Sequence, residues 1–186
     1  MDIFAHGLWA AAAARGVNRK APRRLRVPWV AFFGVFPDLF AFSVPVMLML
    51  WLRLTGGVGA LPGPRHMPFR DLAWQLYRIS HSLIIFAAVF GIVWLLARRP
   101  VLELLGWPLH ILIDIPTHSL RFFATPFLWP LSDYRFNGIS WANRWFMLSN
   151  YTALVIVYIL LWRTSRRSVE PRDVARPSGG AGMPRG

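Results

Sequence analysis

The stretch GWPLHILIDIPTHS, residues 106–119, places three ionisable side chains inside an otherwise apolar segment. His110, Asp114 and His118 are spaced four residues apart, so at helical pitch they share one face. An imidazole or a carboxylate is costly to leave in hydrocarbon, and such groups in membrane segments usually face a bundle interior or a polar cavity. The spacing therefore predicts a polar site on a buried helix face.

The composition of the 186-residue chain is typical of an integral membrane protein, because 55% of its residues are hydrophobic and 15% are aromatic. The chain has no cysteine, which excludes thiolate ligands and cysteine nucleophiles, so any metal must be bound by His, Asp or Glu. The net charge of +13 comes from Lys and Arg residues that bracket the apolar segments. This placement favours membrane lipids as partners and argues against nucleic acid.

The apolar segments predict an all-α integral membrane bundle of about five helices, three or four of them spanning. A shorter N-terminal helix over residues 2–14 precedes the candidate spans, which are residues 29–52, 80–97, 101–119 and 148–162. We expect the second helix to begin near Asp71, because neither Pro nor Gly occurs between that residue and Gly91. Pro37 and Pro45 predict a kinked or broken first span, and broken helices in membranes usually line a cavity.

The basic residues predict an orientation. Six cations lie in residues 15–26, two more are Arg98 and Arg99, and six follow Trp162. The positive-inside tendency places these segments in the cytoplasm, so residues 53–79 and 120–147 face outward. We expect residues 1–164 to form the membrane-embedded domain, and residues 165–186, which are rich in Pro, Gly and Arg, to be a disordered basic cytoplasmic tail.

Polar residues in three other segments are candidates for the same site as His110. His6 lies in the N-terminal helix, Asp38 lies in the first span, and His81 opens the second apolar run. Counted at about 1.5 Å per residue from the nearest cytoplasmic cation, His6, Asp38 and His110 reach similar depths of about 14 to 18 Å. We therefore predict a divalent metal site, with zinc as the first candidate, whose ligands are His6, Asp38, His81, His110 and Asp114.

Two interpretations of these residues stay open. In the first, a metal-activated water attacks an ester, and Asp38 is either a ligand or the general base that takes the water proton. In the second, the same side chains form a buried polar network that holds the helices together without a metal.

The outer connection, residues 125–146, mixes aromatic residues with charged and amide side chains. An interfacial aromatic belt is one explanation. The other is a lid in which Arg135 and Asn137 bind an anionic group of the substrate over the metal, since guanidinium geometry suits phosphate. His66, in the Gly-rich outer loop of residues 56–68, is expected to be ordinary surface.

Several motifs occur in one order along residues 1 to about 130. They are a His near the start, a Pro-Asp pair, a Ser-His-Ser motif, and a Gly-aromatic-x-x-His-x-x-x-Asp block followed by Leu-Trp-Pro: His6, Pro37, Asp38, Ser80, His81, Ser82, Gly106, Trp107, His110, Asp114, Leu128, Trp129 and Pro130. In this order they resemble the bacterial family of inner-membrane, metal-dependent hydrolases. The family pattern commonly carries further ligands at three positions that here hold Phe40, Ala41 and Tyr77.

The resemblance implies a multi-pass protein of the bacterial inner membrane that hydrolyses its substrate with a bound metal. The His-x-x-x-Asp spacing of His110 and Asp114 is also remotely similar to one in zinc-dependent phospholipases C and single-strand-specific zinc nucleases, where both residues bind zinc. That similarity implies a phosphoester substrate, and a lipid-linked one would reach this depth laterally. The alternative is a non-catalytic membrane scaffold or partner-binding protein that retains a structural metal or polar core.

Overall fold

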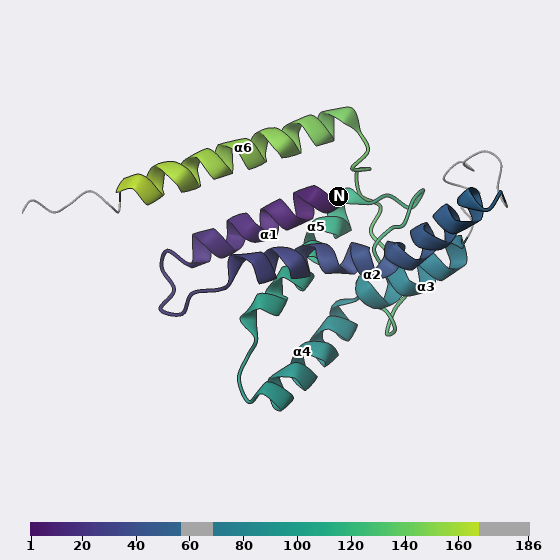
Figure 1. Ribbon diagram of the computed structural model, residues 1–186, viewed down its shortest axis with the longest axis horizontal. Helices are drawn as coiled ribbons and strands as arrows, with labels where there is room; N and C mark the ends of the chain where they lie inside the picture. Colours follow the sequence, from purple (N-terminus) through teal and green to yellow (C-terminus); the bar gives the residue numbers. More distant parts are fainter. Residues whose placement is uncertain (57–68, 168–186) are drawn as a thin grey trace, which may run out of the picture.

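The computed structural model describes residues 1–56 and 69–167, and this part of the chain is helical and contains no strand (Figure 1). Its elements, in chain order, are α1 (Ile3–Val17), α2 (Val27–Leu54), α3 (Arg70–Ser80), α4 (Leu83–Ala97), the short 3-10 helix η1 (Leu102–Leu105), α5 (Gly106–Thr117) and α6 (Arg144–Arg167). The all-α prediction is confirmed. The predicted loop around His66 lies outside the described residues. Of the tail predicted over residues 165–186, residues 165–167 belong to α6 and the rest lies outside the described residues.

Two helices of the described part are long and apolar enough to cross a membrane: α2 and the Arg144–Ser165 portion of α6. Only 17% of the apolar window of α2 and 6% of that of α6 is buried, so both helices present apolar side chains outward, as contact with lipid requires. Helices α3 and α4 meet the same criteria only as a pair, bent by 57°. By length and composition, the described residues therefore contain two candidate spans, or three if the bent pair forms one, and the predicted number of three or four spans is not confirmed.

The predicted span over residues 101–119 is instead a short helix. Helix α5 has 12 residues, which at about 1.5 Å per residue is well short of the roughly 20 residues that a span needs. It begins directly after η1 and ends at Thr117, just past Pro116. His118 therefore lies outside the helix, in extended backbone. The prediction that it shares a helix face with His110 and Asp114 is wrong.

The helix break occurs at a different place from the one predicted. Helix α2 continues through Pro37 and Pro45, both of which are buried. The chain breaks instead at His81 and Ser82, where neither Pro nor Gly occurs. The Ser82 hydroxyl accepts from the backbone N–H groups of Ile84 and Ile85, each at 3.1 Å, and this N-cap starts a new helix in a new direction.

Helix α2 is the central element, in contact with α1, α3 and α5 (Figure 1). Two glycines allow α5 to approach it closely. A Cβ on Gly106 would overlap the carbonyl oxygen of Val30 and lie 2.8 Å from the Gly34 nitrogen. A Cβ on Gly34 would lie 2.5 Å from the Ala10 Cβ of α1. Small residues thus let three helix backbones meet, as is common in membrane bundles.

The basic segments share one end of the molecule. Arg19 of the α1–α2 connection donates to the Leu161 carbonyl oxygen at 2.5 Å. Arg24, Arg26 and Arg99 line one pocket, although Arg99 follows α4 in the chain. In Figure 1 the α1–α2 connection and the C-terminal end of α6 lie on the left, whereas α3 begins on the right. This grouping of cations at one end agrees with the predicted orientation.

The contact between α2 and α5 can be tested by enlarging Gly106. We expect Gly106→Val to separate these helices and lower the free energy of unfolding by about 1 to 3 kcal/mol, the usual cost of overpacking. Thermal unfolding of the purified protein in detergent would measure the change. Gly91→Val is the matched control, because no atom lies within 4 Å of a Cβ at that position. Equal melting temperatures for the two variants would contradict the close approach.

Candidate metal centre

His81 lies in the break between α3 and α4, and its side chain is completely buried. Its Nδ1 atom lies 3.2 Å from the Tyr77 carbonyl oxygen and 2.9 Å from the Ser80 hydroxyl oxygen. Because a carbonyl oxygen can only accept, Nδ1 donates the proton and Nε2 is left with a lone pair. The Tyr77 ring stacks on the imidazole with centroids 3.6 Å apart, which fixes the orientation of His81.

His110 and Asp114 lie one turn apart on α5, and both are buried. The His110 Nδ1 atom donates to the Gly34 carbonyl oxygen of α2 at 2.7 Å. The Nε2 atom of His110 therefore also carries a lone pair. This hydrogen bond requires the close approach of α2 and α5. Gly34 lies one helical turn before Asp38 on α2, so the bond also brings His110 close to Asp38.

Four hydrogen-bond acceptors converge at this point. They are Nε2 of His81, Nε2 of His110, and one carboxylate oxygen each of Asp38 and Asp114, all within 4.8 Å of one another. The two Nε2 atoms are 3.1 Å apart, and in the tautomers with Nδ1 protonated neither Nε2 atom carries a hydrogen to donate to the other. The Asp114 Oδ2 atom is buried without a hydrogen-bond partner among the described residues. Acceptors so close together repel unless a cation or an added proton lies between them.

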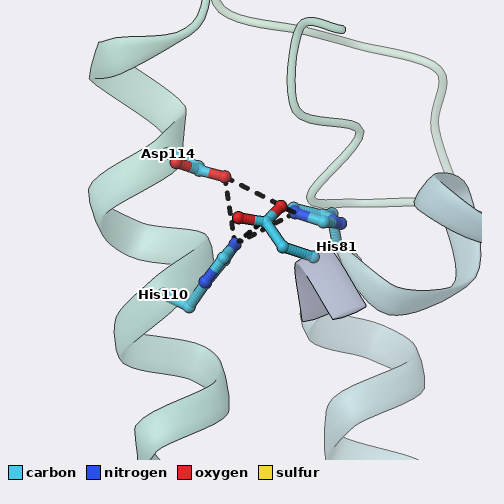
Figure 2. A group of neighbouring side chains, drawn as sticks. His81, His110 and Asp114 are labelled. Carbon is cyan, nitrogen blue, oxygen red and sulfur yellow. Dashed lines mark hydrogen bonds and ion pairs between the residues drawn. The ribbon is translucent and has the colours of Figure 1, made fainter. Parts of the chain in front are cut away.

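The distances suit a metal ion in size. The His81 Nε2 atom lies 3.5 Å from Asp38 Oδ1 and 3.4 Å from Asp114 Oδ2. The His110 Nε2 atom lies 3.7 Å and 3.1 Å from the same oxygens. A tetrahedron of N and O ligands at about 2.0 to 2.1 Å from a metal has edges of about 3.4 Å. Figure 2 shows His81, His110 and Asp114 pointing toward one another from α5 and from the α3–α4 break. This buried group could hold a metal ion.

His6, the fifth predicted ligand, contacts the other oxygen of Asp114. Its Nε2 atom lies 2.8 Å from Asp114 Oδ1, and its ring stacks on His110 with centroids 3.6 Å apart. The His118 Nδ1 atom lies 3.2 Å from the same oxygen, which the Met1 amine also contacts. Asp114 thus faces the four-residue group with one oxygen and His6 and His118 with the other. His6 is close to the group but is not one of its four members.

The positions where the family pattern carries additional ligands are apolar or exposed here. Ala41 and Tyr77 belong to one buried hydrophobic cluster with Phe123. Phe40 is an exposed side chain. Among the described residues, these positions therefore add no ligand to the four-residue group.

Sequence reasoning missed the two backbone carbonyls that orient the histidines. Gly34 offered a signal, because a small residue one turn before Asp38 permits a neighbouring helix to reach its carbonyl oxygen. The Tyr77 carbonyl offered none, since every residue has one. Trp107, part of the predicted block, donates from its indole nitrogen to the Ser80 carbonyl oxygen at 2.6 Å and so supports the helix break.

The predicted anion-binding residues lie beyond the aromatic neighbours of His81. The Arg135 guanidinium lies over Trp74, 5.3 Å from the ring centroid. Trp74 stacks on Tyr77, which in turn stacks on His81. The Asn137 side chain accepts from the Leu120 backbone N–H at 3.0 Å. Two rings therefore connect Arg135 to the four-residue group, and binding of substrate by Arg135 and Asn137 stays a prediction.

Comparisons with protein-family models, curated proteins and solved structures found no match to this chain.

The metal site makes a prediction about composition. We expect the protein, purified in detergent, to carry about one equivalent of divalent metal, and both chelation and His110→Ala to lower its melting temperature. Metal analysis and thermal unfolding would measure this. Tyr77→Phe is the control, because it removes the hydroxyl that bonds Thr125 at 3.3 Å but keeps the ring that stacks on His81. Metal-free protein that melts identically with and without chelator would count against the site.

Proposed function

We propose that this chain is a membrane-embedded, metal-dependent hydrolase of the bacterial inner membrane that acts on a phosphoester, and that it belongs to the family it resembles. The observation that carries the proposal is the convergence of two imidazole Nε2 atoms and two carboxylate oxygens within 4.8 Å of one another. Two imidazoles and two carboxylates suit zinc, manganese or iron. We take zinc first, because the spacing of the acceptors is close to that of a tetrahedral zinc site.

The four members of the group differ in a way that suits catalysis. His81, His110 and Asp114 are fully buried, whereas the Asp38 side chain is 14% exposed. The distance from Asp38 Oδ1 to His110 Nε2, 3.7 Å, is the longest of the four nitrogen–oxygen distances in the group. Catalytic zinc sites usually have three protein ligands and a water in the fourth position. Asp38 is then the base that accepts the proton of that water. A bound divalent metal would supply a coordinated water with a pKa of about 7 and would polarise the phosphoryl oxygen.

A lipid-linked substrate is supported by a groove between α1, α5 and α6. The groove has a volume of about 710 Å³, and its lining includes Trp9, Leu109 and Ile113. It also reaches Thr117, whose hydroxyl lies 3.5 Å from Asp114 Oδ1. An acyl chain in this groove would approach Asp114 from the membrane side, at the oxygen that faces His6, without passing through water.

A non-catalytic scaffold with a structural metal is the second candidate. One observation favours it: four protein ligands can close a tetrahedron, as in structural zinc sites, and leave no position for water. In that case Asp38 is a permanent ligand and not a base.

Replacing Asp38 separates the two functions. For the hydrolase, we expect phosphomonoester, phosphodiester or phospholipid cleavage with zinc or manganese, and a loss of about a hundredfold or more in Asp38→Asn with metal retained. For the scaffold, we expect no cleavage, and a loss of metal and thermal stability in the same variant. Substrate turnover, metal content and melting would be measured together. Asp133→Asn is the matched control, since that carboxylate is 82% exposed and pairs with Arg78.

A further inference from the structure

A second polar site lies at the end of α3 far from His81. The lining of a pocket of about 260 Å³ there includes three arginines, together with an acidic residue and two aromatic ones: Arg70, Arg121, Arg135, Asp71, Trp74 and Phe123. Arg70 begins α3, whereas the other two arginines lie in the connection between α5 and α6. The fold therefore brings these guanidinium groups together from positions up to 65 residues apart.

Among the described residues, the charges that line this pocket are not balanced. Among residues 1–56 and 69–167, none of the three arginines has a carboxylate within the 4.0 Å of an ion pair. Asp71 is the one acidic residue of the lining, so three cations face one anion and the pocket has a net charge of +2. Membrane orientation does not explain this cluster, because it lies at the opposite end of α2 from the basic α1–α2 connection (Figure 1).

Hydrogen bonds hold two of the arginines in place. The Phe122 N–H donates to the Ser119 carbonyl oxygen at 3.0 Å, which closes a tight turn around Arg121. The Asn137 side chain accepts from the Leu120 N–H at 3.0 Å and ties this turn to the segment that carries Arg135. The Arg135 guanidinium is further oriented over the Trp74 ring.

The same two segments are joined along the backbone. Gly138 N–H donates to the His118 carbonyl oxygen at 2.8 Å, and Ile139 N–H donates to that of Pro116 at 2.9 Å. The relative position of Arg121 and Arg135 is therefore set by the fold and not by their side chains alone.

We propose that Arg70, Arg121 and Arg135 form a binding site for a phosphate group, either free or in a phospholipid headgroup. Guanidinium groups bind phosphate oxygens in pairs of parallel hydrogen bonds, and a net charge of +2 matches one phosphate. The N-terminal amides of α3, which have no side-chain cap, add partial positive charge beside Arg70.

This site does not depend on the proposed hydrolase. The stacked rings of Trp74 and Tyr77 lie along α3 between Arg135 and His81, so the phosphate site is separate from the four-residue group. Arg135 and Asn137 then belong to this phosphate site and not to the predicted lid over the metal. Asn137 acts here as a positioning residue that links the turn around Arg121 to the segment of Arg135.

Calorimetric titration of the purified chain in uncharged detergent would test the proposal. One arm uses inorganic phosphate, and the other uses dioctanoyl phosphatidylglycerol in mixed micelles, with dioctanoyl phosphatidylcholine for comparison. We expect Arg121→Gln and Arg135→Gln each to weaken binding about tenfold, the effect of losing one charged hydrogen-bonding partner. Arg144→Gln removes the same charge from an arginine that lies over Trp145, outside the pocket, and should bind normally.

The outcomes separate the two sources of phosphate. Arginine-dependent binding of inorganic phosphate identifies free phosphate as sufficient, whereas binding of phosphatidylglycerol alone identifies a lipid headgroup. Repeating the titration after chelation should leave the arginine-dependent binding unchanged, so a failure of the metal site would not affect this result. Absence of binding in both arms, or equal binding by Arg121→Gln, Arg135→Gln and the wild type, would overturn the proposal. Equal melting temperatures would establish that these exposed substitutions leave the fold intact.

Discussion

The Nδ1 atoms of His81 and His110 donate to backbone carbonyls, and this constraint directs both Nε2 lone pairs toward the same two carboxylates. Each carbonyl belongs to a different helix, α3 for His81 and α2 for His110. The arrangement therefore exists only when α2, α3 and α5 are packed together. The close contact at Gly34 and the break after Ser80 both serve this geometry, because one admits His110 and the other turns His81 inward.

Much of this centre could be predicted from the sequence. Polar residues in apolar segments are few, and counting residues from the basic segments placed His6, Asp38 and His110 at similar depths. The structure brings these segments together, with Asp38, His81, His110 and Asp114 forming the group. The role of His6 could not be predicted, because a residue count gives depth but not which oxygen of Asp114 a ring will face.

The errors in the helices have a common physical cause. Pro37 and Pro45 predicted a kinked or broken α2, and the helix is not broken at either residue. The real break is stabilised by groups distant in sequence, since the Leu83 N–H donates to the Phe127 carbonyl oxygen at 3.0 Å and Ser82 donates to that of Trp129. Local propensity contains no information about such partners. In the same way, Arg135 was predicted from its side-chain chemistry, whereas its position depends on Trp74 and on backbone bonds to another segment.

The bend between α3 and α4 also has a consequence for biosynthesis. A peptide N–H exposed to hydrocarbon is strongly unfavourable, and the one at Leu83 finds its acceptor 44 residues later, at Phe127. The hydrogen bond between Leu83 and Phe127 can therefore form only after residue 127 has been synthesised. Because His81 lies in this bend, its position depends on a segment that follows α5 in the chain.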